Sequence, residues 1–132
     1  MKAFLIALAL GCTQAVFAQD LPSKPLTPTQ YQEVAKTQKG ILVDVRTPEE
    51  FAQGHLKKAR NLDYRGGVFA QQLESLDKSK TYYLYCASGN RSGKALQLMK
   101  EAGFEHVYNI GGFTALQAAG LPTKTPKAQP KQ

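Results

Sequence analysis

The sequence predicts an α/β fold, built as three layers in which helices cover both faces of a central parallel sheet. Short runs of apolar residues alternate along the chain with segments whose apolar residues recur at helical spacing, and ordinary connection lengths separate them. The run Ile41–Val45 is almost continuously apolar, which is typical of a strand covered on both faces of a parallel sheet.

The first half of the chain contains two helix starts with the same capping pattern. In Thr27-Pro28-Thr29-Gln30 a capping box is combined with proline at the first helical position, and we expect the helix to end near Gly40. Thr47-Pro48-Glu49-Glu50 repeats the pattern and predicts a short helix through Phe51. The strand at 41–45 would lie between these helices.

The second half continues the alternation of strands and helices. Ala95, Leu98, Met99 and Ala102 recur at helical spacing and predict a helix from Ser92 that Gly103 ends. The other expected elements are strands at 60–62, 81–85 and 107–110, a helix at 68–76, and a last helix that contains Phe113 and Leu116 and ends at Gly120.

The two ends of the chain are expected to lie outside the folded domain. An early Lys2, an apolar run from Ala3 to Leu10 and small residues toward Ala18 are typical of a secretory signal peptide. An alternative reading makes Cys12 a lipid-attachment site. We expect a signal peptide at 1–18, a lead-in at 19–26, one domain at 27–122 and a disordered basic tail at 123–132. Export would place the protein in a bacterial periplasm, without stable membrane insertion.

Charge and cysteine content narrow the possible functions. The formal net charge is +7, and it falls to +6 when the leader and Lys2 are removed. A positive charge of this size is compatible with binding small anions or an acidic partner. The sequence lacks the dense basic stripe expected of a nucleic-acid-binding protein. Loss of the leader also leaves Cys86 as the sole cysteine, so no internal disulfide forms. A lone thiol in an oxidising compartment needs an explanation, and the plainest is a buried, inert cysteine.

The position of Cys86 in the sequence favours a catalytic nucleophile over a buried, inert cysteine. It stands where the strand at 81–85 meets a loop of small residues, at the sheet edge where ligands bind in open parallel sheets. The backbone N–H groups of that loop can converge on a negative charge, and the following helix adds its positive dipole end. Such surroundings lower the pKa of a thiol. The residues expected to bind substrate around Cys86 are Ala87, Ser88, Gly89, Asn90 and Ser92, with Gly89 at a positive φ.

Spacing separates this loop from other anion-binding loops. The segment 89–95 is one residue short of a nucleotide P-loop and ends in Ala95 where a hydroxyl should bind magnesium. Cysteine phosphatases place five residues between nucleophile and arginine, whereas four separate Cys86 from Arg91, a tighter ring that suits one extra sulfur better than a phosphoryl group. We expect no metal site, since His55 and His106 are the only histidines.

Three motifs together resemble the rhodanese-type sulfurtransferases in their single-domain, exported form. They are LVDVRTPEEFAQGHLKKARNL at 42–62, CASGNRS at 86–92 and NIGGF at 109–113. The resemblance implies four or five parallel strands and a persulfide carried on Cys86. It also implies a small anionic sulfur donor such as thiosulfate, a thiol or cyanide as acceptor, and no metal or organic cofactor. We expect a monomer.

The remaining site residues are assigned supporting roles. Arg91 would orient an anionic donor or brace the loop. Burying the Asp44 carboxylate in an apolar strand costs free energy unless it is paired or hydrogen-bonded. The resemblance implies that Asp44 ties the strand end to the active loop, with Arg46 nearby. Arg65 is the best candidate among the surface cations for attracting a dianion at the pocket mouth, and His55 is expected to be structural.

These residues leave three functions to be separated. The leading one is a thiosulfate sulfurtransferase that uses Cys86 as its nucleophile. The second is a cysteine-dependent phosphatase or arsenate reductase on the same scaffold, which the four-residue spacing disfavours. The third is a non-catalytic rhodanese-like module that binds an anion or a partner protein.

Overall fold

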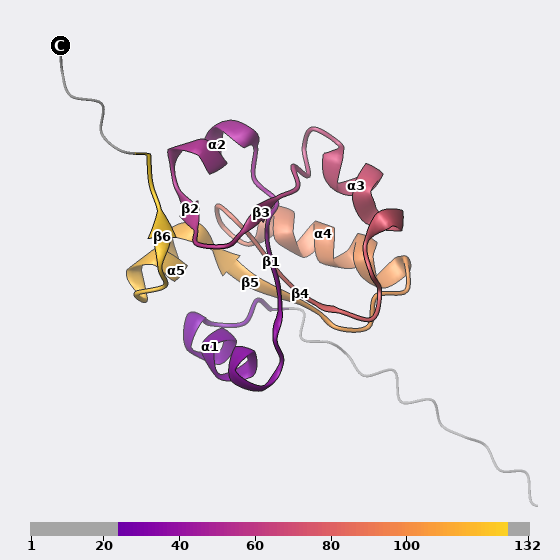
Figure 1. The fold of residues 1–132 in the computed structure, drawn as a ribbon, viewed down its shortest axis with the longest axis horizontal. Helices are drawn as coiled ribbons and strands as arrows, with labels where there is room; N and C mark the ends of the chain where they lie inside the picture. Colours follow the sequence, from indigo (N-terminus) through magenta and orange to yellow (C-terminus); the bar gives the residue numbers. More distant parts are fainter. Residues whose placement is uncertain (1–23, 127–132) are drawn as a thin grey trace, which may run out of the picture.

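The computed structural model describes residues 24–126 and contains a four-stranded parallel sheet in the order β3-β1-β4-β5 (Figure 1). All three strand pairings are parallel, so the predicted α/β class and the parallel sheet are confirmed. The strands are β1 (Gly40–Asp44), β3 (Arg60–Asn61), β4 (Thr81–Cys86) and β5 (Val107–Gly112).

The helices begin where the capping patterns predict. Thr27 and Thr47 each form a complete capping box with the glutamine or glutamate three residues later. The segment at 68–76 is an α-helix only in its first half and continues as a 3-10 helix. The helices are α1 (Pro28–Thr37), α2 (Pro48–Gln53), α3 (Val68–Gln72), η1 (Leu73–Ser75), α4 (Asn90–Glu101) and α5 (Phe113–Ala118).

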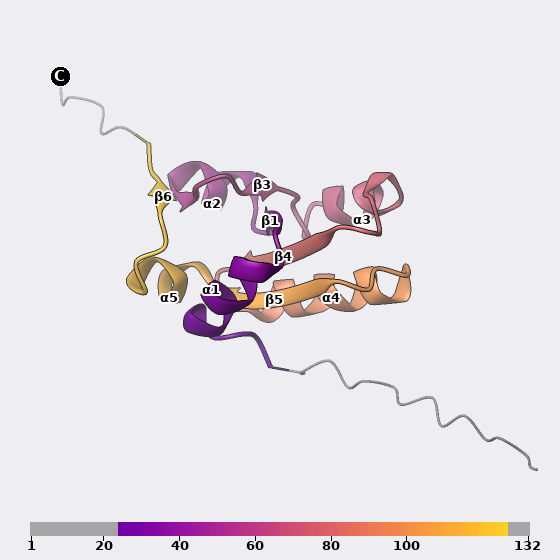
Figure 2. The same ribbon diagram turned by 60° about the horizontal axis from the view of Figure 1, so that its bottom comes forward.

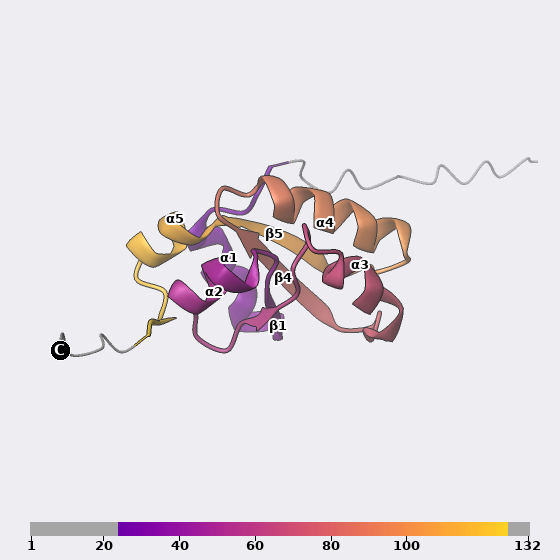
Figure 3. The same ribbon diagram turned by 90° about the horizontal axis from the view of Figure 1, so that it is seen from above.

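Helices cover both faces of the sheet, giving the three layers that were expected. α3 and α4 lie together on one side of the strands, and α1 and α5 lie on the other (Figures 2 and 3). Each face has its own apolar cluster. Cys86, Phe69 and Met99 pack in the cluster under α3 and α4, whereas Tyr85 and Leu116 pack in the cluster under α1 and α5.

A second, two-stranded sheet was not anticipated. β2 (His55–Leu56) pairs antiparallel with β6 (Thr123–Lys124). The prediction of a disordered tail from residue 123 is therefore wrong at its first two residues, because Thr123 and Lys124 pair with Leu56 and His55. The expected signal peptide and Cys12 lie outside the described residues. Within residues 24–126, none of the helices has the length and apolarity needed to cross a membrane.

Candidate active site

Cys86 ends β4, and its sulfur lies inside the turn that leads to α4. Sγ accepts a hydrogen bond from the Gly89 amide at 3.0 Å and lies 3.4 Å from Ser92 Oγ. Gly89 has φ +92°, so the predicted left-handed residue is confirmed, and this conformation turns its N–H back toward the sulfur. The site therefore combines a thiol with converging donors from both the backbone and a side chain.

The surroundings favour the thiolate. Burial raises the pKa of the Cys86 thiol, but hydrogen bonds from the Ser92 hydroxyl and amide act in the opposite direction. The amides of Ser88 and Gly89 add to that effect, and the net pKa of Cys86 lies below its ordinary value. A larger fraction of the thiol is thus ionised at neutral pH than in an exposed cysteine.

Ser92→Ala is expected to raise the pKa of Cys86 and lower the thiolate fraction at neutral pH. The variant loses a donor to the charged sulfur, and such hydrogen bonds contribute about 1.5–3 kcal/mol each. Titrating the ultraviolet absorbance of the thiolate measures the change without requiring access to the sulfur. Ser88→Ala is the matched control, because it keeps the Ser88 amide and should titrate like the parent protein. An unchanged titration in Ser92→Ala would contradict the assigned role of the hydroxyl.

Asn109 holds the turn from the neighbouring strand, β5. Its Nδ2 donates to the Gly89 carbonyl at 3.0 Å, and its Oδ1 accepts hydrogen bonds from Ser92 Oγ at 2.8 Å and from the Gly111 amide at 3.0 Å. Because a hydroxyl carries one proton, Ser92 donates to Asn109 or to Sγ, but not to both at once. Sequence reasoning missed Asn109 as a site residue, although it is the first residue of the NIGGF motif.

Arg91 faces α2 and braces the turn. Its two terminal nitrogens each lie 2.8 Å from an oxygen of Glu50, in a bidentate ion pair. Hydrogen bonding to Arg91 lowers the pKa of Glu50 to about 2, so the pair stays ionised at neutral pH. Glu50 also accepts from the Thr47 amide at 2.9 Å and thereby caps α2. Of the two expected roles of Arg91, this geometry favours bracing.

Asp44 and Arg46 form a buried ion pair at the end of β1. Arg46 Nη2 lies 2.8 Å from Asp44 Oδ2 and also donates to the Gly54 carbonyl at 2.6 Å. The guanidinium carbon lies 4.3 Å from the centre of the Phe113 ring. The expectation that Asp44 ties β1 to the active loop is corrected, since the brace runs through Arg46 to the turn between α2 and β2.

The other residues considered in the sequence lie in three different places. Ala87, Ser88 and Asn90 are exposed on the outer surface of the turn, and of these only Ser88 has an amide that contributes to the hydrogen bonding of Sγ. Arg65 is exposed in the turn before α3 and forms no hydrogen bond or ion pair with a described residue. His55 stacks on Phe51 at 3.6 Å and donates to its carbonyl from Nδ1, as expected of a structural histidine.

Access to the sulfur is restricted. Cys86 has 0% of its surface exposed. Two shallow pockets flank the turn, one of about 350 Å³ bordered by Gly89 and Lys94 and one of about 260 Å³ bordered by Glu50 and Phe113, and Cys86 lines neither. Across residues 24–126, no group of three or more His, Cys, Asp or Glu side chains is placed to hold a metal ion.

Comparison with known proteins identifies similar sequences and folds. Residues 27–119 match the sequence model of the Rhodanese family, described as a Rhodanese-like domain. The chain is 40% identical over 106 residues to an uncharacterized protein of Synechocystis, covering 80% of this chain but only 58% of that relative's length. It is 32% identical to the thiosulfate sulfurtransferase GlpE of Pseudomonas putida, covering 77% of this chain and 91% of the relative. The solution structure of the Rhodanese-like domain of the Anabaena Alr3790 protein superimposes with a TM-score of 0.67 at 26% identity, covering 82% and 85% of the two chains.

Proposed function

The chain belongs to the rhodanese-like domain family, and on this premise we propose that it is a sulfurtransferase in which Cys86 carries the transferred sulfur as a persulfide. The donor is thiosulfate or a similar sulfane-sulfur anion, and the acceptor is cyanide or a thiol. The observation that carries the proposal is the hydrogen bonding of Sγ by Gly89 and Ser92, which favours the thiolate required for nucleophilic attack.

The reaction divides into two displacements at sulfur. The Cys86 thiolate attacks the outer sulfur of thiosulfate, a new S–S bond forms to Sγ, and the S–S bond of the donor breaks as sulfite leaves with the bonding electron pair. Cyanide or a thiolate then attacks the terminal sulfur of the persulfide and restores the Cys86 thiolate. In each step one bond to the transferred sulfur forms as another breaks, and the leaving group keeps the bonding electron pair, so neither step consumes an external oxidant or reductant.

The turn suits this chemistry because its donors are fixed before the reaction. Asn109 holds the Gly89 carbonyl on one side of the turn, and the Arg91–Glu50 pair fixes the other side. Preorganised donors stabilise developing negative charge without reorganising during the reaction. The relatives named thiosulfate sulfurtransferase support the same assignment.

Incubation of the folded protein with thiosulfate is expected to add the mass of one sulfur, about 32 Da, to Cys86. Intact-mass spectrometry followed by peptide mapping checks both the mass and the position. Cyanide should remove the added mass and release thiocyanate, and Cys86→Ser should acquire none. Unmodified Cys86 in a folded sample would overturn the proposal.

The complete burial of Cys86 favours one second candidate, a non-catalytic module that binds an anion or a partner protein. The two candidates differ in what Cys86→Ser does. A binding module keeps its biological role in that variant, whereas a sulfurtransferase loses it.

We also propose that the protein works in a bacterial periplasm, on the evidence of the signal-peptide pattern in residues 1–18. The protein recovered from a periplasmic fraction should then have the mass of the chain without those residues. Recovery of the full-length chain from the cytoplasm alone would contradict this assignment.

A further inference from the structure

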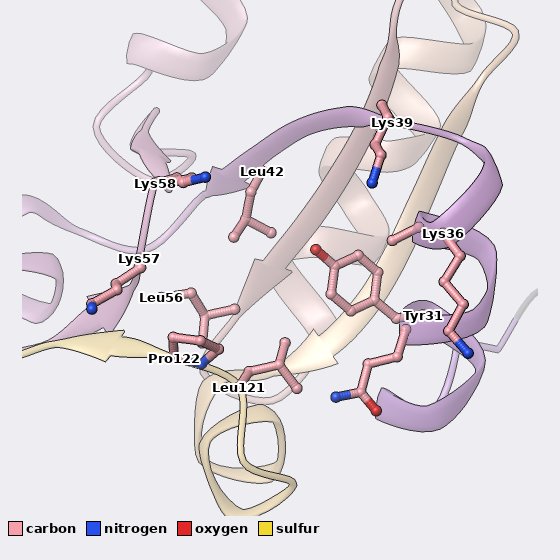
Figure 4. A pocket seen from close by; sticks show the side chains of 11 residues that line it. Tyr31, Lys36, Lys39, Leu42, Leu56, Lys57, Lys58, Leu121 and Pro122 are labelled. Atoms are coloured by element: carbon pink, nitrogen blue, oxygen red, sulfur yellow. The ribbon is translucent and has the colours of Figure 1, made fainter.

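A pocket of about 440 Å³ lies on the face of the sheet opposite the Cys86 side chain, between α1 and the ribbon formed by β2 and β6 (Figure 4). Its volume is in the range of small-molecule sites. Leu42, Leu56 and Leu121 provide an apolar surface, and the ring of Tyr31 stands beside them. The pocket is therefore separate from the candidate active site.

Contacts from several elements fix the shape of the pocket. The Leu56 amide donates to the Tyr85 hydroxyl at 3.0 Å, and the Lys57 amide donates to the Pro122 carbonyl at 2.9 Å. On the α1 side, the ring of Tyr31 packs edge-on against Tyr83, with 4.9 Å between the ring centres. An apolar ligand would thus enter a surface that is already formed.

The rim of the pocket is cationic. Its lining includes no aspartate or glutamate but has four lysines, which are Lys36, Lys39, Lys57 and Lys58. Lys36 pairs with Glu33 at 2.6 Å, but Lys39 and Lys58 form no ion pair with any residue between 24 and 126. Figure 4 shows the ammonium groups of Lys39 and Lys58 turned toward the pocket, with the Tyr31 hydroxyl directed to the space between Leu42 and Lys39.

The backbone of Lys58 has an unusual conformation, which bears on how this residue can be tested. It has φ +68° and is the one residue other than glycine with a positive φ in the described part of the chain. Glycine adopts this conformation at no steric cost, whereas a lysine is strained in it. The hydrogen bond from the Ala59 amide to the Leu56 carbonyl, 3.1 Å long, closes a turn in which Lys58 is the third residue, and turns of this kind take a positive φ there.

From the apolar surface and the unpaired lysines, we propose that this pocket binds a small amphipathic carboxylate. The apolar body lies against the three leucines, and the carboxylate lies between Lys39 and Lys58, within reach of the Tyr31 hydroxyl. The ligand is a free small molecule, because the pocket has the volume of a small-molecule site and is rimmed by cations. The proposal does not depend on sulfur transfer at Cys86.

Decanoate below its micelle concentration is the probe, measured by calorimetry on the full chain. One molecule is expected to bind saturably, and Cys86→Ser should bind it equally well. Lys39→Glu should weaken binding by at least about tenfold, since it replaces an attractive charge with a repulsive one. Lys78→Glu is the matched control, because it makes the same charge change beside Phe104 in the other apolar cluster and should leave binding unchanged.

Lys58→Gly separates ligand binding from folding. It should unfold at an equal or higher temperature than the parent protein, because glycine relieves the strain, and yet it should bind decanoate more weakly. Decyltrimethylammonium, a cation with the same chain, should bind poorly. The proposal is overturned by the absence of decanoate binding, by equal binding of the cation, by full affinity in Lys58→Gly, or by binding to anionic vesicles alone.

Discussion

Gly112→Ala is expected to lower the rate of sulfur transfer at Cys86 by about 100-fold, the scale of effect that a misplacement of about 1 Å produces in an active site. Gly112 lies beside Cys86 in the pairing of β5 with β4. A Cβ atom at Gly112 would come within 2.5 Å of the Ala87 carbonyl oxygen and 3.2 Å of Ser88 Cα. Both are backbone atoms of the turn, so the backbone must shift at this contact, and we expect the Ser88 and Gly89 amides to be displaced from Sγ.

A control is needed because overpacking also costs about 1–3 kcal/mol of stability. Gly120→Ala provides it, since Gly120 has φ +88° and no atom lies within 4 Å of the added Cβ. That variant should be destabilised by about 1–2 kcal/mol but should keep its rate of sulfur transfer. The measurement is the rate of thiocyanate formation at a temperature where both variants are folded. A folded Gly112→Ala protein with the parent rate would contradict the role given to the turn.

Local sequence patterns were sufficient to predict most of the fold and the centre of the site. The capping boxes at Thr27 and Thr47 each depend on residues three positions apart, so both could be predicted from adjacent sequence. The same holds for Cys86, where an apolar strand, a loop of small residues and a helix start follow one another directly. Gly89 could be assigned a positive φ because that short turn demands one.

The residues that complete the site could not be predicted in this way, because their partners are distant in the sequence. Glu50 and Arg91 are 41 positions apart, and Asn109 is 20 positions from Gly89. No periodicity links such pairs, and only the order of the strands brings them together. The β2–β6 ribbon was missed for a related reason, since strands of two residues are too short to carry a pattern.

Asp44→Ala is expected to destabilise the protein by about 3–5 kcal/mol, because removing one partner of a buried ion pair leaves the other charge uncompensated. Asp44 has 0% and Arg46 has 6% of its surface exposed, so the variant leaves a largely buried guanidinium without its carboxylate partner. Arg46 would keep the Gly54 carbonyl and the faces of the Phe113 and Tyr85 rings. The Arg46 amide would also lose its hydrogen bond to Asp44 Oδ1, which is 2.9 Å long. Urea unfolding with a constant m-value measures the loss.

The double variant Asp44→Leu/Arg46→Met tests whether the loss arises from the unpaired charge. Replacing both members of a buried pair with apolar residues is often nearly neutral, so the double variant should unfold at a higher urea concentration than Asp44→Ala. If instead both variants lose the same stability, the hydrogen bond from the Arg46 amide to Asp44 Oδ1, which both variants lack, accounts for the effect. A single variant as stable as the parent would show that the pair contributes nothing, and the packing of Arg46 on Phe113 would then be sufficient to hold the end of β1 beside the turn.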